Sequence, residues 1–235
     1  NKAIYYIKLS ADQNFSTAQN FLGAIYVLGK YVGQDIKYGM HYLEKAANQG
    51  DANALYFLSS IYINGDFVKK DIKKGLYYMN LSASHHHILS LVYLGIFHFY
   101  GFFGQKDINK AIHYLSIASN KNDADAQYNL GVIYFFVQFS LNKSIKYLSL
   151  AANQNHNLAR FMLGTLYFDG KYVNRNINLA IRYYKMSSSM NCNYSKNNLA
   201  IIYKNGIGVE KNIFFAIELL KESIRFKNDK LSMYN

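Results

Sequence analysis

The sequence contains no proline, no tryptophan and one cysteine among 235 residues. The lack of proline excludes collagen-like segments and proline-rich linkers, and a lone Cys192 excludes an internal disulfide or a cysteine-rich zinc site. Long apolar runs are also missing. The longest, residues 88–103, contains His98 and falls short of the ~20 residues that a membrane-spanning helix needs. Disorder is excluded as well, because hydrophobic residues make up 51% of the chain.

Arginine is scarce although the chain is strongly basic. Lys and Arg together number 26 against 14 Asp and Glu, a net charge of +12, yet only 4 of the basic residues are arginine. A basic chain can bind nucleic acid, an acidic protein or an anionic membrane surface. Surfaces that bind phosphate usually use arginine, whose planar fork grips phosphate through two hydrogen bonds. The excess of lysine over arginine, together with abundant Asn, Ile, Tyr and Phe, therefore indicates that the positive charge comes from the codon usage of an AT-rich genome rather than from a phosphate-binding surface.

A motif with a small residue at its centre recurs along the chain. Its copies begin at Ala18, Ala54, Ser90, Ala126, Ala159 and Ser195. The intervals are 36 residues, except one of 33. A second half-unit follows each copy, such as DIKYGMHYLEKAANQG from Asp35, and the N-terminal KAIYYIKLSADQN matches this second half alone. The chain therefore contains six full units and a leading half-unit.

Both half-units have the spacing of amphipathic helices. Ala18, Leu22 and Ile25 form one apolar stripe, and the Asp or Asn that opens most second halves is a typical N-cap. One helix pair cannot bury its stripe alone, whereas stacked pairs share a continuous core. We predict an all-α fold, a right-handed α-solenoid of antiparallel helix pairs, as a single domain over residues 1–235. Its expected parts are a half-repeat 1–14, repeats at about 15–50, 51–86, 87–122, 123–155, 156–191 and 192–227, and a tail 228–235.

The best copy, AQNFLGAIYVLGKYVGQDIKYGMHYLEKAANQG from Ala18 to Gly50, resembles the Sel-1-like repeat family, a relative of the tetratricopeptide repeat. The departures are the shortened fourth unit, His98 in a tyrosine position, Ala200 in a glycine position and an atypical last helix. The resemblance implies a non-enzymatic scaffold or adaptor that binds a protein partner. Some eukaryotic relatives serve endoplasmic-reticulum ubiquitin ligases, so it also suggests a subunit of such a quality-control complex, whereas bacterial relatives modulate signalling or host contact.

Residues with catalytic or metal-binding chemistry do not form a recognisable constellation. His85, His86 and His87 are consecutive, and neighbouring residues point in different directions on a helix, so we expect a solvated turn rather than a metal site. Cys192 has no patterned histidine nearby, and the carboxylates are scattered over repeat starts and turns. We therefore predict no enzymatic activity, no metal and no cofactor.

The predicted partner surface is the concave face formed by the first helices. Positions three before and four after the central small residue avoid the apolar stripe. They are apolar in the middle of the chain, at Tyr56, Ile63, Val92, Phe99, Tyr128, Phe135, Phe161 and Phe168. An exposed apolar row of this length is typical of an interaction site, and we expect a partner's peptide or helix in this groove. Two alternatives stay open: tight curvature hides these side chains, or the chain self-associates.

Other interpretations concern charge and location. Lys69, Lys70, Lys73 and Lys74 cluster on one loop and helix start, which indicates a solvated edge or, alternatively, a contact for an acidic partner. Basic helical-repeat RNA binding is the rival function, disfavoured because the concave positions are aromatic or aliphatic. Cytoplasm and endoplasmic-reticulum lumen both stay open as compartments. The start without methionine leads us to expect a piece of a longer protein.

Overall fold

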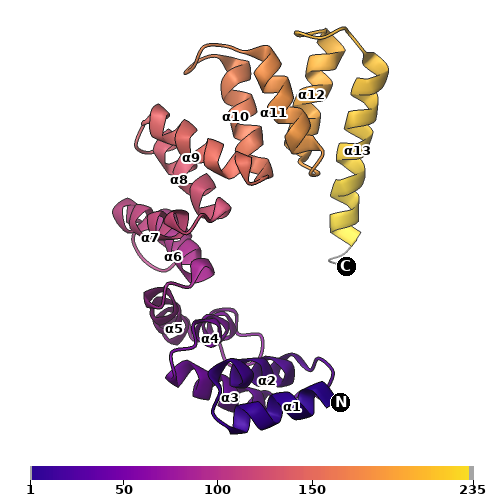
Figure 1. Ribbon diagram of the computed structural model, residues 1–235. Helices are drawn as coiled ribbons and strands as arrows, with labels where there is room; N and C mark the ends of the chain where they lie inside the picture. Colours follow the sequence, from indigo (N-terminus) through magenta and orange to yellow (C-terminus); the bar gives the residue numbers. More distant parts are fainter. Residues whose placement is uncertain (1, 233–235) are drawn as a thin grey trace. The chain divides into compact units, whose positions relative to one another are not determined.

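The computed structural model describes the backbone of residues 2–232 and the side chains of residues 2–225. Helices joined by turns and loops make up this part of the chain, and it contains no strand (Figure 1). The helices are α1 (Lys2–Asp12), α2 (Ser16–Leu28), α3 (Ile36–Asn48), α4 (Ala52–Asn64), α5 (Ile72–Ser84), α6 (Ile88–Tyr100), α7 (Ile108–Asn120), α8 (Ala124–Phe136), α9 (Leu141–Asn153), α10 (Asn157–Asp169), α11 (Ile177–Ser188), α12 (Asn193–Asn205) and α13 (Ile213–Ser232).

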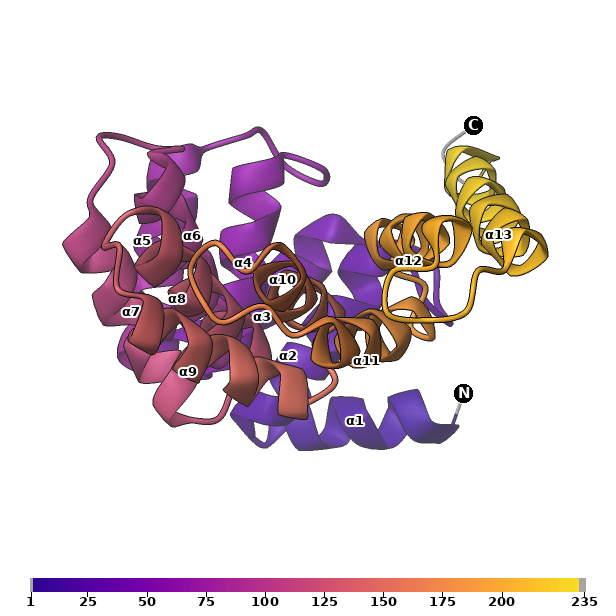
Figure 2. The same cartoon turned by 90° about the horizontal axis from the view of Figure 1, so that it is seen from above.

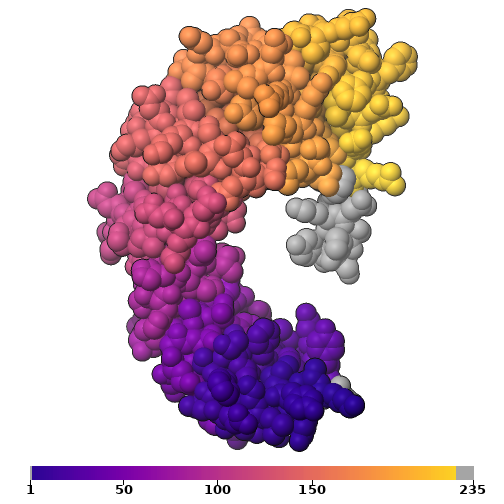
Figure 3. Space-filling view, viewed as in Figure 1, coloured from indigo at the N-terminus to yellow at the C-terminus, as the bar shows by residue number. Residues whose placement is uncertain are grey.

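The helices pack as the predicted antiparallel pairs, which confirms the all-α solenoid. Contacts are densest within α2–α3, α4–α5, α6–α7, α8–α9, α10–α11 and α12–α13, and α1 is the leading half-repeat that packs on α2. The pairs form two compact units, residues 1–121 and 122–235, called unit 1 and unit 2 below. The pairing is visible from a second direction (Figure 2), and the surfaces of α10, α11 and α12 in unit 2 form one packed body (Figure 3). No described helix is long and apolar enough to cross a membrane.

Side chains cap the helices where the sequence predicted it, and at four further places. Asp35 accepts a hydrogen bond from the backbone N–H of Tyr38 at 2.9 Å, and Asp71, Asp107, Asn176 and Asn212 cap their helices in the same way. The first helices α4 and α8 use Asp51 and Asp123. Satisfying a free N–H of the first turn stabilises a helix by about 0.5–2 kcal/mol.

The triple histidine is only partly the predicted solvated turn. His85 and His86 are exposed, whereas His87 is half-buried and its side chain accepts a hydrogen bond from the backbone N–H of Ser90 at 3.3 Å. It therefore caps α6 as Asp51 caps α4. His156 caps α10 through the N–H of Ala159 at 3.1 Å. A neutral imidazole can accept this bond through its unprotonated nitrogen.

Left-handed residues end the helices. Gly29, Gly65, Gly101, Gly170 and Gly206 have φ between 66° and 81° and close the first helices. The second helices end near Asn14, Gly50, His86, Asn122, Asn155 and Asn191, which also have positive φ. The fourth repeat has no such glycine, and α8 ends at Val137 in a right-handed conformation.

Small residues bring the two helices of a pair into backbone contact. A Cβ built on Gly23 would lie 2.6 Å from Cγ of Leu43 and 2.8 Å from the carbonyl oxygen of Gly39. Gly39 in turn faces Val27, whose Cγ2 would be 2.7 Å from a Cβ on that glycine. The core residues lie around such contacts, and Leu22 and Leu43 are fully buried. The pair geometry therefore depends on the absence of a side chain at Gly23.

Successive repeats meet at a buried position that the sequence pattern did not indicate. This joint position directly follows the first residue of each repeat motif, and its side chains are at most 6% exposed. The residues at the joint position are Gln19, Leu55, Leu91, Gln127, Arg160 and Lys196. Four of the six are polar or charged, so each needs a specific partner.

The polar joints are satisfied by the ends of the second helices. Gln127 donates to Asn122 Oδ1 at 3.2 Å and accepts from Gln154 at 2.8 Å; Gln19 makes the equivalent bonds with Asn14 and Gln49. Each of these glutamines therefore links the end of the preceding repeat to the end of the second helix of its own repeat.

The cationic joints use different partners. Arg160 donates to the carbonyl of Ala152 at 3.0 Å and to that of Met186 at 3.4 Å. These carbonyls lie at the C-terminal ends of α9 and α11, where the helix dipoles favour a positive charge. Lys196 forms an ion pair of 2.9 Å with Glu222.

The Gly23→Ala substitution tests the close approach. We expect it to lower the free energy of unfolding by about 1–3 kcal/mol, because the new methyl group would overlap the α3 backbone. Urea unfolding followed by circular dichroism measures the effect. Gly33→Ala is the matched control, since a Cβ there meets nothing within 4 Å, and we expect it to change stability by less than about 0.5 kcal/mol. Equal effects of the two substitutions would refute the packing argument.

Candidate partner-binding site

An apolar cavity of about 510 Å³ lies between the first helices α8 and α10 of unit 2. Tyr128, Val132 and Phe135 of α8 line one side, and Phe161 of α10 lines the other, with Tyr172 of the following loop at the edge. A second hollow of about 160 Å³ is lined by Phe135, Phe136, Phe139, Leu141 and Tyr172. Cavities of this size with mostly apolar walls are typical binding sites.

The cavity occurs where the repeat is shortened. In three other repeats the loop after the first helix supplies a valine that packs on the core: Val68, Val173 and Val209. The loop of residues 137–140 is three residues shorter, and its Phe139 is 84% exposed. The shortened loop therefore leaves Tyr172 of the following loop partly uncovered, whereas Phe136 occupies a position that is also exposed beside a full-length loop, as Tyr100 is.

Aromatic rings hold the walls in place. Phe135 contacts Tyr172 edge-on with 5.2 Å between ring centres, and it contacts Phe136 in the same way at 4.8 Å. Tyr128 stacks on the ring of His156 at 4.5 Å. Edge-on and stacked rings stabilise such a wall beyond the burial of their area, so the cavity is bounded by mutually supported side chains.

His156 supports this wall and also caps α10. Its Nδ1 accepts from the Ala159 N–H, so Nε2 carries the proton and donates to Asp125 at 3.1 Å. Burial lowers the pKa of His156, and the nearby carboxylates of Asp125 and Asp123 oppose this shift without reversing it. The imidazole that supports Tyr128 is therefore neutral near pH 7.

The structure brings three of the predicted partner-binding residues together: Tyr128, Phe135 and Phe161. Phe168 points elsewhere, since its ring lies 6.3 Å from buried Tyr184 and the Arg175 guanidinium lies over it at 5.7 Å. Phe168 therefore packs against the core of unit 2 and contributes no wall to the cavity.

The predicted residues of unit 1 line none of the cavities described in that unit. Val92 is only 6% exposed and is corrected to a core position. Ile63 is partly buried and faces its own helix pair, with Cγ1 at 2.5 Å from a Cβ built on Gly75. The Tyr56 ring lies tilted against the His87 ring at 4.9 Å, and Phe99 contacts Tyr100 edge-on at 4.8 Å.

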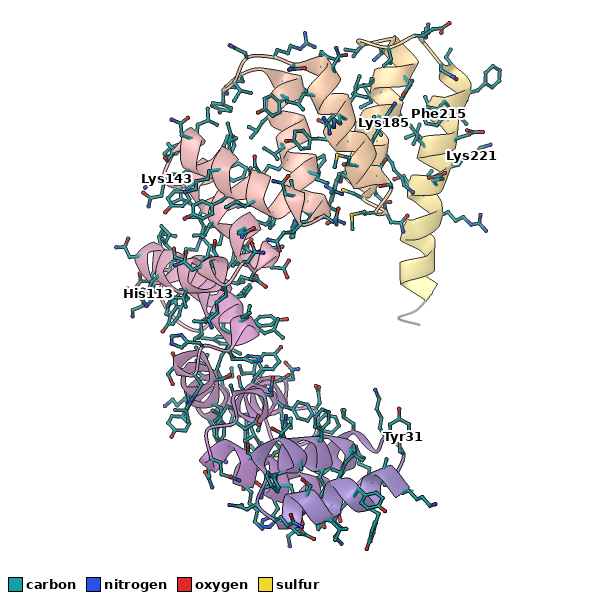
Figure 4. The ribbon with its side chains drawn as sticks, in the orientation of Figure 1. Tyr31, His113, Lys143, Lys185, Phe215 and Lys221 are labelled. Atoms are coloured by element: carbon teal, nitrogen blue, oxygen red, sulfur yellow. The ribbon has the colours of Figure 1, made fainter. Side chains whose placement is uncertain are left out.

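Three lysines of the predicted cluster lie in solvent, and the fourth packs against its own repeat. Lys69, Lys70 and Lys73 are exposed. Lys74 lies 4.2 Å above the Tyr62 ring and donates to its hydroxyl at 2.7 Å; this hydrogen bond raises the pKa of Lys74 against the effect of burial. Lys143 and Lys185 lie over Tyr134 and Tyr203 in the same manner (Figure 4).

Sequence reasoning missed Phe136 and Tyr172. The 33-residue interval would have indicated Tyr172, because it marks a repeat whose loop is too short to cover its neighbour. It carries no signal for Phe136, since that position is also exposed in a repeat of full length, as at Tyr100. Among the described side chains, no group of three or more His, Cys, Asp or Glu residues is placed to hold a metal ion.

A family model for the Sel1 repeat matches nearly the whole sequence. The matched segments are residues 1–15, 16–51, 52–87, 88–123, 124–136, 138–156, 157–192 and 194–225. The chain belongs to the Sel1 repeat family. The Sel1 match is interrupted within the short loop of the fourth repeat, next to the cavity. A search among curated proteins gives no match.

Solved structures share the fold of these Sel1 repeats. The c5321 protective antigen of uropathogenic Escherichia coli has a TM-score of 0.88 and 24% identity, over 94% of this chain and 48% of that one. This chain thus spans about half the length of that antigen. A Sel1 repeat protein of Oxalobacter formigenes has a TM-score of 0.79 and 24% identity, over 90% and 86% of the two chains. The immunity protein Pa5087 of Pseudomonas aeruginosa has a TM-score of 0.52 and 20% identity, over 80% and 74%.

The histidine caps predict a specific pH dependence. Burial also lowers the pKa of His87. Because the folded pKa lies below the ordinary value of 6.5, protonation favours the unfolded chain. The contribution of both caps is therefore complete above pH 6.5 and is lost as the pH falls toward the folded pKa values.

The His87→Asn/His156→Asn variant isolates this effect, because asparagine caps without titrating, as Asn176 does. Urea unfolding at about pH 7.5 and about pH 5 measures it. We expect acidification to destabilise the wild type more than the variant, since other groups titrate equally in both. An identical loss in the two proteins would contradict the cap assignment.

Proposed function

We propose that this protein is a non-enzymatic interaction scaffold that holds an apolar segment of a partner protein in the cavity between α8 and α10. The observation that carries the proposal is the cavity itself. Aromatic side chains bound it, and Phe136 and Tyr172 remain 60% and 53% exposed. Exposed aromatic clusters beside a hollow are typical of protein interfaces.

The family supports the general role. Sel1 repeat proteins generally serve as scaffolds for protein interactions, and the non-enzymatic assignment rests on this family behaviour. Membership of an endoplasmic-reticulum ubiquitin-ligase complex stays a prediction from the resemblance.

The energetics of the cavity suit a short peptide. Burying one large apolar side chain contributes roughly 1.5–3 kcal/mol, while ordering a peptide costs several kcal/mol. Two or three anchoring side chains therefore suffice for micromolar affinity. Asp169 and Lys171 also line the cavity, so polar groups of either sign on the peptide find a partner.

Nucleic-acid binding is not supported by the family or the structural neighbours. Lys74, Lys143 and Lys185 lie over tyrosine rings, and the walls of the cavity are mainly apolar. A polyanion would need a row of cations along a groove instead.

Peptide selection tests the proposal and does not require the natural partner. Peptides are selected by phage display against the wild-type protein, and their affinities are measured by fluorescence anisotropy. We expect the Phe136→Ser/Tyr172→Ser variant to lose about tenfold or more in affinity, because it removes two exposed anchors. Both side chains are more than half exposed, so the fold should persist, which circular dichroism verifies.

Tyr31→Ser is the matched control. Tyr31 follows Gly29 by two residues, as Tyr172 follows Gly170, but it is 84% exposed in unit 1 and projects from its loop (Figure 4). We expect the control to bind as the wild type does. The triple variant Tyr128→Ala/Phe135→Ala/Phe161→Ala probes the inner wall. Peptide binding that survives both the rim and the inner-wall variants, in folded protein, would refute the proposal.

A further inference from the structure

Unit 1 has a cavity of its own, of about 400 Å³, between α5, α6, α7 and the loop that joins α6 to α7. It lies where two residues depart from the repeat. Gly104 occupies the loop position that holds Val68 and Val173 in other repeats, and His98 occupies the position of Tyr62 and its counterparts. Both residues line the cavity.

The missing valine side chain accounts for the space. Val68 and Val173 pack against the cores of their repeats, whereas a Cβ built on Gly104 meets no atom within 4 Å. The backbone of Gly104 is not in the left-handed region, so a valine would fit here. This glycine is therefore not required by the turn.

Replacement of tyrosine by histidine makes the same space polar. His98 stacks on Tyr114 with 5.7 Å between ring centres, just as Tyr134 stacks on Tyr147 at 5.5 Å. Lys74 and Lys143 lie over the tyrosines of their repeats. Lys110 holds the same position on α7 but lies 3.6 Å from Asp107, with its side chain 62% exposed.

The cavity has a positive rim. Lys106 and Lys110 line it together with the amides of Asn80 and Gln105. The only carboxylate in the lining is Asp107, and it already accepts the N–H of Lys110 as the cap of α7 at 2.9 Å. One ammonium group thus lacks a counter-charge in the lining. Leu76, Leu94, Phe97 and Phe103 form the apolar remainder.

We propose that this cavity binds a carboxylate carried on an apolar group, with the carboxylate at Lys106 and Lys110 and the apolar group against Phe97 and Phe103. Such a ligand pairs the excess positive charge and fills the space that the missing valine leaves. A free small acid and the C-terminal residue of a protein share this chemistry. The proposal concerns unit 1 and does not depend on the proposed function of unit 2.

Two probes distinguish the sources: 3-phenylpropionate, and a five-residue peptide that ends in phenylalanine with a free carboxylate. The C-terminally amidated peptide is the negative control. Isothermal titration calorimetry measures affinity, and the imidazole NMR signals of His98 report binding at the site. We expect the carboxylate probes to shift these signals and the amidated peptide to bind about tenfold more weakly. Binding of the peptide alone would assign the site to a protein C-terminus, and binding of both would assign it to the carboxylate chemistry itself.

Gly104→Val closes the cavity by restoring the residue of the other repeats. We expect it to weaken probe binding at least about tenfold while stability is retained. Gly33→Val, in the corresponding loop of the first full repeat, is the matched control and should bind normally. Lys106→Gln/Lys110→Gln should weaken carboxylate binding by a similar factor. Absence of binding to the wild type by both probes, or unchanged binding to Gly104→Val, would overturn the proposal.

Discussion

The backbone contact between paired helices is the constraint on which the rest of the structure depends. Gly23 has no side chain, so α2 and α3 approach until the carbonyl of Gly39 lies where a methyl group would be. At this separation Leu22 and Leu43 are completely buried, with α1 closing the core around Leu22 and α4 closing the core around Leu43. A wider pair would leave gaps that a two-layer array has no third layer to fill.

Because each pair is so thin, its outer features respond directly to changes of a few residues. A deletion of three residues in one loop leaves Tyr172 of the next loop partly uncovered, and glycine in place of valine at position 104 leaves a cavity. In a globular domain, neighbouring elements would cover such a gap. Here a repeat contacts only its neighbours, so each departure from the pattern becomes a surface feature. Both candidate sites of this protein lie at such departures.

The helices, their order and most of their caps could be predicted from the sequence, because period, stripe and capping residue are local properties. Asp35 and Gly29 show this: each acts within a few residues of its own position. The site was predicted less well, since position relative to a stripe does not say which neighbouring helix a side chain meets. Val92 shares its phase with Tyr128, yet it is packed inward and only 6% exposed. The cap formed by His87 is equally local, but histidine is not a usual N-cap residue. The buried Arg160 depends on carbonyls 8 and 26 residues away, a relation that the repeat pattern does not contain.

The polar joints give the order of the repeats a physical meaning. Gln127 is matched to Asn122 before it and Gln154 after it, whereas Arg160 is matched to the carbonyls of Ala152 and Met186. Each joint residue thus has its own set of partners, although the repeats share one pattern. Moving a repeat to another place in the chain would bury a charged or amide side chain without its matching partners. Recombination that preserves the fold must therefore carry each joint residue together with its partners, and the partners of Gln127 and Arg160 overlap in sequence between Ala152 and Gln154.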